Sequence, residues 1–390
     1  MNPYDFARID WSRPPERRKP VWHHRLFGVG LPRLYSGRLE LRLTARTPIF
    51  IPAYSLAAAG KAIRDPRKPE PFIQDGAGHY IIPGTSLKGL LRSLVETLGN
   101  GCLTLFDGNY EQEKTGERGR YKAVYKDKVK PEFLHCQDDT HLCIACRIFG
   151  SLKEHKRESI FMGKVNIGDA QVDPETVALY GPMYTKPLVE PKPHHRAFYL
   201  DEQERYIAGR KFYFHHDPTR KPLQAGDYVY FTRAQPANRY IHPLGNDTVF
   251  YARLDFTNLE RDELGALLLA IVLEEGMCHK IGYAKPLGLG SIALEPLRLE
   301  LIDYARRYSF SARGQDGREQ LQGEALAQFI DELVEEFKRE HLQRLAMEDL
   351  RRIWRWPPDP NVKYYYPDKA GWFDQPENAR KRIAETRDSA

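Results

Sequence analysis

The sequence contains no run of 18 apolar residues, and its first ten residues lack the apolar core of a secretory signal. We therefore expect a soluble, cytoplasmic protein without a membrane partner. The sequence also lacks a large net charge. Its 59 lysines and arginines and 53 acidic residues give a net charge of +6 at pH 7. This small excess permits a polyanionic partner but does not require one.

Cysteine is scarce, at five residues in 390, but its spacing is informative. Cys136, Cys143 and Cys146 fall within eleven positions, whereas an oxidised, secreted scaffold would spread paired cysteines along the chain. The clustering predicts a metal site in a reducing compartment. A redox pair is disfavoured by the third cysteine, and a zinc deaminase by the lack of an upstream His-x-Glu.

A tetrahedral zinc ion needs one ligand more than these three cysteines supply. We favour His141 as the fourth ligand, because His135 is adjacent to Cys136 and the side chains of neighbouring residues tend to diverge. His135 and the more remote Cys102 and Cys278 remain alternatives. The zinc would be structural, holding together an insertion that has too few apolar residues to order itself.

Residues 82–92, IPGTSLKGLLR, are the most informative stretch of the chain. A short extended segment ends at Pro-Gly, and leucines on one face then predict a helix. Such a turn points free backbone N–H groups and the positive helix end outward. It predicts a phosphate-binding turn made by Thr85, Ser86, Lys88 and Arg92. A Walker loop is excluded by its longer glycine spacing, and an ordinary strand-to-helix turn is the alternative.

A second candidate contact with a polyanion is residues 279–291, HKIGYAKPLGLGS. Gly288 and Gly290 would let a ribose-phosphate chain approach the backbone closely, and His279, Lys280 and Lys285 supply charge and hydrogen bonds. A dinucleotide fingerprint is excluded, because its third glycine is missing and a strand is expected next. A plain hairpin turn is the alternative interpretation.

Basic and aromatic residues alternate in RKFYFHH, residues 210–216. Single-stranded RNA is held by such a pattern, with cations on phosphates and rings on bases. Arg210 and Lys211 are therefore candidate RNA contacts, although a half-buried strand has the same pattern. The neighbouring histidine pairs, 194–195 and 215–216, lack paired carboxylates, and we interpret them as solvated or structural.

In their order and spacing, the IPGTSLKGLLR turn, the CIACRIFG segment at 143–150 and the late KPLGLG loop resemble motifs of the RAMP superfamily of CRISPR-associated proteins. The resemblance covers residues 37 to 300. Members of this family build type III RNA-guided effector complexes. The resemblance implies a subunit that holds guide RNA (crRNA), meets target RNA and contacts other effector subunits.

Family members that cut RNA use an aspartate two residues before a Pro-Val-Ile-like run that precedes the Pro-Gly turn. The matching run here begins at Pro71, so the expected position falls on Pro69, with Glu70 beside it. Asp65 is the nearest upstream aspartate, and we name it the candidate catalytic residue, assisted by a Mg²⁺-like ion. Whether the subunit is a target-RNA endoribonuclease stays open. The alternatives are a metal-independent pre-crRNA processing endoribonuclease on the same fold and a non-catalytic structural adaptor.

The expected order of elements is strand, helix, strand, strand, helix, strand, which describes an α+β, ferredoxin-like (RRM-like) core, as the resemblance also implies. Residues 1–36 would form a basic, aromatic and irregular N-terminal arm, and residues 37–312 the core. The core would carry a zinc-knuckle insertion at about 102–150 and long loops or a thumb hairpin at about 172–246. Residues 313–390 would form a C-terminal helical extension and tail.

Apolar residues in the extension recur at intervals of three and four from Leu326 to Leu345. This pattern predicts one long amphipathic helix from Gly323 to about Trp354. The apolar stripe needs a partner, either the chain's own core or a neighbouring subunit. Because the opposite face mixes acidic and basic residues, we expect the helix to be an interface element outside the RNA path.

Overall fold

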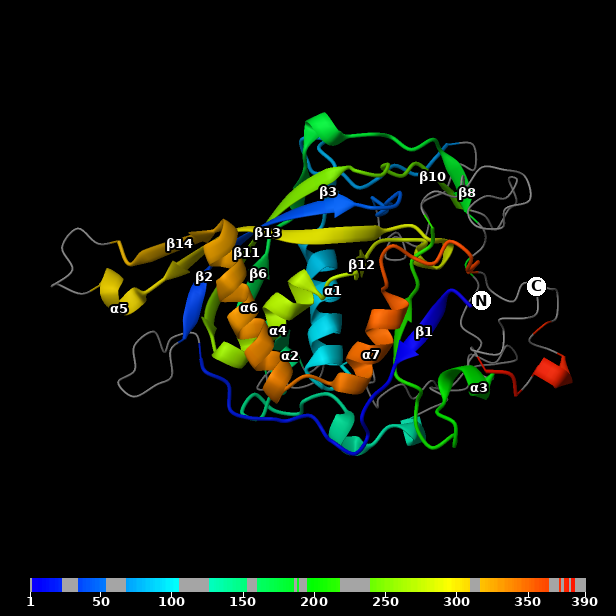
Figure 1. The fold of residues 1–390 in the computed structure, drawn as a ribbon, viewed down its shortest axis with the longest axis horizontal. Coiled ribbons are helices and arrows are strands. Elements are labelled where there is room, and N and C mark those ends of the chain that lie inside the picture. Colours follow the sequence, from blue (N-terminus) through cyan, green and yellow to red (C-terminus); the bar gives the residue numbers. More distant parts are fainter. Residues whose placement is uncertain are drawn as a thin grey trace.

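The computed structural model describes residues 2–22, 34–53, 68–104, 126–152, 160–185, 188, 195–217, 239–308, 316–364, 372, 375–378 and 380–382. They form a mixed α/β structure in which helices lie against one face of a central antiparallel sheet (Figure 1). No helix within these ranges is long and apolar enough to span a membrane.

The central sheet has the strand order β12-β13-β2-β11-β7-β3, with β14 pairing to β13 and β6 to β11. Its strands are β2 (Tyr35–Ala45), β3 (Ile81–Ile82), β6 (Val165–Ile167), β7 (Ala170–Val172), β11 (Val249–Leu259), β12 (His279–Lys280), β13 (Ser291–Ile302) and β14 (Arg318–Gln322). In β2, every second residue from Leu39 to Ala45 is buried, and the residues between them face outward. This alternation places one sheet face in the core.

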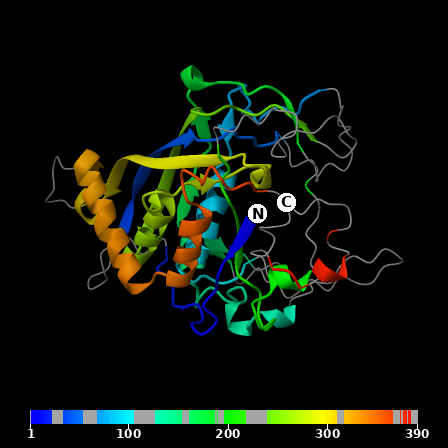
Figure 2. The ribbon, with the colours of Figure 1, turned by 45° about the vertical axis from the view of Figure 1, so that its right-hand side comes forward.

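The helices are α1 (Gly84–Leu98), α2 (Ile144–Phe149), α3 (Arg196–Tyr199), α4 (Arg261–Val272), α5 (Tyr304–Arg307), α6 (Gly323–Glu340) and α7 (Arg344–Ile353). α4 packs between α1 and α6 and also contacts β13. Turning the molecule by 45° shows α6 and α7 on the same side of the sheet as α1 and α4 (Figure 2). These helices bury the apolar face of the sheet.

In the part of the chain that the structure describes, three short strand pairs lie outside the central sheet. β1 (Tyr4–Ala7) pairs with β9 (Arg210–Tyr213), and the N-terminal arm is therefore partly regular, unlike the irregular arm that the sequence predicts. β8 (Met183–Thr185) pairs with β10 (Arg239–Ile241). β4 (Gly150–Ser151) pairs with β5 (Phe161–Met162).

The prediction of one long C-terminal helix is wrong, because the chain breaks between α6 and α7. The N–H of Gln343 in this break donates to the carbonyl of Leu98 at the end of α1, and α7 then packs against α1 and β1. The apolar stripe of α6, which includes Ile330 and Phe337, is buried against the chain's own core. The stripe therefore gives no reason to expect a neighbouring subunit.

A buried ion-pair network joins α2 and α4 to the loop before β6 and to the N-terminal arm. Lys164 and Glu263 have wholly buried side chains, and their charged atoms are 2.7 Å apart. Arg147 also contacts Glu263, at 3.1 Å. The network comprises Arg18, Arg147, Lys164, Glu260, Asp262 and Glu263. Its three positive and three negative charges balance, as burial requires.

Candidate metal centre and basic surface

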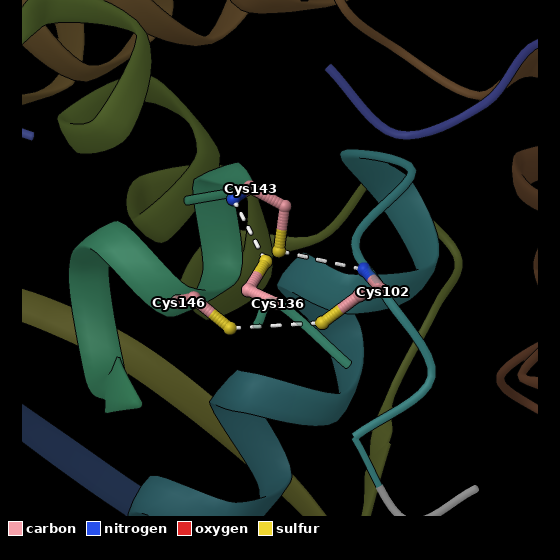
Figure 3. Close-up of side chains that lie close together, drawn as sticks. All are labelled: Cys102, Cys136, Cys143 and Cys146. Atoms are coloured by element: carbon pink, nitrogen blue, oxygen red, sulfur yellow. Dashed lines mark hydrogen bonds between the residues drawn. The ribbon is translucent and has the colours of Figure 1, made fainter. Parts of the chain in front are cut away.

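Four cysteine side chains converge where the end of α1 meets α2 (Figure 3). Cys102 follows α1, Cys136 lies in the preceding loop of α2, and Cys143 and Cys146 belong to the start of α2. All four are buried, and their sulfur atoms lie within 4.8 Å of one another. Sulfurs around tetrahedral zinc, with Zn–S bonds of about 2.3 Å, are about 3.8 Å apart. The cluster could therefore bind a metal ion such as zinc.

Backbone N–H groups point at the sulfur atoms. The N–H of Cys143 donates to Cys136 Sγ at 3.3 Å, and the N–H of Cys102 donates to Cys143 Sγ at 3.4 Å. Among the four thiols, the hydrogen bonds lower the pKa of Cys136, chiefly through Cys102, and raise the pKa of Cys102, chiefly through Cys136, and that of Cys146, chiefly through Cys102. These shifts therefore do not favour the thiolate at every cysteine, but the backbone N–H donors do so at Cys136 and Cys143. Such donors favour thiolates, which are the form of cysteine that binds metal.

The structure brings Cys102, and not His141, to the other three cysteines. The side chain of His141 is 67% exposed, and its Nδ1 lies 2.9 Å from the hydroxyl of Thr140. The carboxylate of Asp138 accepts the N–H groups of Thr140 and His141. Because this turn carries His141 on the outside of the loop, the histidine cannot complete the site. His135 instead contacts Ser151.

Arg92 and Arg210, which the sequence suggests as RNA contacts, support this cluster. Arg92 lies 3.6 Å from Cys146 Sγ and also binds Glu96, at 2.9 Å. Arg210 donates to the carbonyls of Gly101, at 2.7 Å, and Cys102, at 3.0 Å. Both guanidiniums are committed within the protein, and we correct their assignment to a structural one.

The charges around the cysteines fit a divalent ion. A third guanidinium, that of Arg17, lies beside the cysteines. Burial acts to lower the pKa of Arg17, but a hydrogen bond with Cys136 and the charges of the cysteines outweigh burial, and the pKa is raised. Arg210 also pairs with Glu96 at 3.3 Å. Arg17, Arg92 and Arg210 contribute +3 and Glu96 contributes −1, while a divalent ion with four thiolates contributes −2. The sum is zero, and a buried site of this kind favours neutrality.

The turn at the start of α1 is only partly open to a phosphate. The N–H of Gly84 already donates to the carboxylate of Asp169 at 2.8 Å. A Cβ on Gly84 would lie 2.1 Å from the carbonyl oxygen of Ile167, so close packing explains the glycine. Thr85 is exposed, and Ser86 and Lys88 are half-buried. An anion at this turn would also meet the negative charge of Asp169.

The late glycine loop is largely buried. His279 Nε2 lies 2.8 Å from the carbonyl of Ala270. Gly290 has a φ of +80°, and an added Cβ would lie 1.8 Å from the carbonyl oxygen of Ile281. The loop glycines, Gly288 and Gly290, are buried, so their conformation is needed for packing within the chain.

Three lysines gather around this loop. Lys280 is 4% exposed, and its ammonium donates to the carbonyl of Gly288 at 3.0 Å. Burial lowers its pKa to about 7. Burial and the charge of Lys285 lower the pKa of Lys211 to about 8. Within the described ranges, none of Lys211, Lys280 and Lys285 forms an ion pair with a carboxylate. We call these three residues the lysine cluster.

Aromatic rings flank the lysine cluster. Lys211 Nζ lies 3.7 Å from the ring centre of Tyr4 and 5.0 Å from that of Tyr213, and Lys285 Nζ lies 5.9 Å from that of Tyr213. Tyr4 comes from the N-terminal arm, which pairs with β9. Sequence reasoning missed Tyr4, because no local pattern links it to residues 211 and 285.

A second aromatic group lies on the β8–β10 pair. The rings of Tyr184 and Tyr240 stack at 4.2 Å and 13°. The guanidinium of Arg239 lies 4.5 Å from the ring centre of Tyr283, in the late glycine loop. Glu70 binds Arg239 with both carboxylate oxygens at 2.8 Å. Glu70 is therefore held in an ion pair, while Asp65 lies outside the described residues.

A family model, the RAMP superfamily, matches residues 42–293. The match begins in β2 and ends in β13, and it includes the four cysteines and the lysine cluster. α6 and α7 lie beyond it. No curated protein sequence matches the chain.

Proposed function

The chain belongs to the RAMP superfamily of CRISPR-associated proteins, and from this we propose that it is an RNA-binding subunit of a type III CRISPR ribonucleoprotein. In this proposal it holds the backbone of guide RNA, meets target RNA and contacts other effector subunits in the cytoplasm. Its core would be ferredoxin-like, since β2, α1, β6 with β7, β11, α4 and β13 follow the expected order.

The lysine cluster is the observation that carries the proposal. Bringing ammonium groups together in a partly dehydrated site, without a carboxylate, costs free energy in the free protein. The lowered pKa values of Lys211 and Lys280 express that cost. A phosphodiester that contacts Lys211 and Lys285 would supply the missing negative charge. Lys280 is more deeply buried and would attract the phosphodiester by its charge, without direct contact.

The aromatic residues next to the cluster favour RNA over an acidic protein. Tyr283 and Lys285 lie on the same loop, and Arg239 connects that loop to β10 through its contact with Tyr283. The stacked rings of Tyr184 and Tyr240 stand on the same strand pair. Cations for phosphates and rings for bases are the combination with which proteins hold single-stranded RNA.

The outward face of the central sheet is not where we place RNA. Positive and negative side chains alternate across β2 and its neighbours and pair with one another. The contacts are Arg38–Asp255 at 2.6 Å, Arg42–Glu295 at 2.5 Å and Arg298–Glu40 at 2.5 Å. Because these charges are already matched, the face offers little attraction to a phosphate backbone.

Removal of two lysines tests the RNA site. The double variant Lys211→Ala, Lys285→Ala should weaken binding of two unrelated single-stranded RNAs to a similar extent, because both lysines would bind the RNA backbone. The slope of log K against log salt should fall by about 1.4, at about 0.7 for each phosphate that the protein no longer neutralises. The matched control, Lys338→Ala with Arg339→Ala on α6, removes the same charge elsewhere. Equal affinity in both double variants would contradict the proposal.

We propose zinc as the metal held by Cys102, Cys136, Cys143 and Cys146, in a structural role. When bound, zinc would tie the end of α1 to α2 and so stabilise the fold. Metal analysis of freshly purified, reduced protein should find about one zinc per chain. Protein that is folded and free of zinc would refute this assignment.

We also propose that Asp65, assisted by Mg²⁺, cleaves target RNA. Asp65 lies outside the residues that the structure describes. In an assembled complex, Asp65→Ala should remove the cuts at this subunit's position and leave target binding intact. Unchanged product bands would exclude Asp65. Cleavage of repeat RNA in EDTA would favour the processing endoribonuclease, and an isolated protein without any affinity for RNA would favour the structural adaptor.

A further inference from the structure

A cavity of about 810 Å³ opens between the end of α7, the segment that follows α7, and the residues after β9. Its walls include Phe214, His215, Arg351, Arg352, Arg355 and Tyr364. All of these except Phe214 and His215 lie beyond the family match at 42–293. The cavity shares no residue with the lysine cluster, and its size suits a nucleotide-sized ligand.

The basic side chains of the cavity exceed the acidic ones. Among the residues that the structure describes, four cations and two carboxylates, Glu348 and Asp359, line it. Glu348 contacts Arg8 at 3.4 Å, outside the lining, and Asp359 accepts the N–H of Asn361. Glu348 and Asp359 are therefore partly engaged already. Because Arg351 and Arg352 are paired with Glu274 and Asp5, the attraction for an anion comes from Arg355.

Two of the arginines are held in fixed positions, and a third is unpaired. Arg351 binds Glu274 through Nε at 2.6 Å and Nη2 at 3.0 Å. Arg352 binds Asp5 at 2.8 Å. Arg355 is exposed and makes no ion pair with any residue that the structure describes. A guanidinium with free N–H groups in the wall of a cavity is suited to bidentate binding of phosphate.

The apolar part of the cavity is a stack of planar groups. The rings of Phe214 and Tyr364 are 4.7 Å apart and 16° from parallel, and the guanidinium of Arg352 lies 5.8 Å from the ring centre of Phe214. A nucleobase is a planar ring that can extend such a stack. An acidic peptide would match the charge but would not use the stack.

We infer that this cavity binds a nucleotide, with the base on the Phe214–Tyr364 stack and the phosphate at Arg355. Two sources share this chemistry, a free mononucleotide and the phosphorylated end of an RNA. The inference does not depend on the proposed RNA path over the lysine cluster, because the two sites have separate residues.

Calorimetric titration of full-length protein, purified free of nucleic acid, with 5′-AMP tests the inference. AMP should bind at least about ten times more tightly than adenosine, because the nucleoside has no phosphate to accept charge-assisted hydrogen bonds. Arg355→Ala should weaken AMP binding by about ten-fold or more, and Arg355→Lys by less. The matched control is Arg339→Ala, an exposed arginine on α6 that should leave AMP binding unchanged.

Competition identifies the source of the nucleotide. Displacement of AMP by an RNA with a 5′-phosphate, but not by the same RNA with a 5′-hydroxyl, assigns the cavity to an RNA end; no displacement by either assigns it to a free nucleotide. The double variant Lys211→Ala, Lys285→Ala should bind AMP normally, which separates this inference from the proposed function. Absence of AMP binding, equal binding by Arg355→Ala, or displacement of AMP by a glutamate-rich peptide would overturn the inference.

Discussion

Replacing Lys280 with methionine should stabilise the RNA-free protein at neutral and acidic pH. Burial lowers the pKa of this lysine from 10.5 to about 7. Keeping the lysine charged in the folded protein therefore lowers the free energy of unfolding. Both acceptors of the ammonium keep another polar partner. The carbonyl of Gly288 also accepts the hydroxyl of Thr47 at 3.0 Å, and Ser291 Oγ lies 2.7 Å from His215 Nδ1. The substitution therefore leaves neither acceptor without a partner.

The pH dependence follows from the direction of the shift. The folded-state pKa is below the unfolded-state value, so the unfolded chain binds more protons between pH 7 and pH 10.5, and stability rises with pH across that window. The destabilisation is complete below pH 7 and absent above pH 10.5. At about 1.4 kcal/mol per pKa unit it amounts to about 5 kcal/mol at pH 6 and about 2 kcal/mol at pH 9.

Denaturant unfolding of wild type and Lys280→Met at pH 6, 7.5 and 9 measures the effect. The advantage of the variant should shrink by about 3 kcal/mol from pH 6 to pH 9. Lys68→Met, a change at an exposed lysine, is the matched control and should show no such trend. A variant that is less stable than wild type at pH 6, with a difference independent of pH, would refute the reasoning.

RNA affinity should change with pH in the opposite direction. Phosphate favours charged lysines, and the pKa values of Lys211 and Lys280 are about 8 and about 7. Binding should therefore weaken as pH rises from 7 to 9 and should take up protons, which calorimetry in buffers of different ionisation enthalpy detects. Affinity that is constant over this range would separate the lysine cluster from RNA binding.

Four further substitutions test the metal site and the core. Cys102→Ser should lower the zinc content and thermal stability, whereas His141→Ala should change neither, as measured by metal analysis and thermal unfolding. Glu263→Gln should cost about 3 to 5 kcal/mol in denaturant unfolding, because it leaves Lys164 buried without its partner. Gly84→Ala should also destabilise, by more than about 1 kcal/mol, because its Cβ would overlap the backbone of Ile167.

For each of these predictions, a different experimental result would contradict the reasoning. Zinc retained in Cys102→Ser but absent from His141→Ala would restore the histidine as ligand. A destabilisation below about 1 kcal/mol for Glu263→Gln would be typical of an exposed pair and would contradict the burial of the network. A Gly84→Ala protein with wild-type stability would show that the turn has room for a side chain.

Local patterns in the sequence were sufficient for the central elements. The alternation of apolar and polar residues from Arg38 to Ala45 predicts the strand that becomes β2, and the Pro-Gly turn followed by leucines on one face predicts α1. Both patterns involve residues only a few positions apart, and local backbone geometry determines which of those residues share a face. The ordered motifs also pointed to the RAMP superfamily, which the family match confirms.

Tertiary packing decided which residues form the metal site and whether basic side chains point into the fold or toward solvent. Cys102 lies far from Cys136 in sequence, and only the packing of α1 against α2 brings them together. Arg92 lies on the α1 face that meets the cysteines, so its charge stays inside the fold. Sequence proximity favoured His141, but a turn of the backbone places it in solvent.

Short-range spacing in the sequence was enough to indicate the order of the central strands and helices, the cysteine signal and the family, but not the break between α6 and α7 or the strand in the N-terminal arm. The tertiary structure alone decided which charged residues remain available to a ligand. Lys211, Lys285 and Tyr4 come from separate segments that meet only when β1 pairs with β9 beside the late glycine loop. Whether a cation is neutralised within the protein or left for an outside anion depends on such long-range contacts, which no local pattern records.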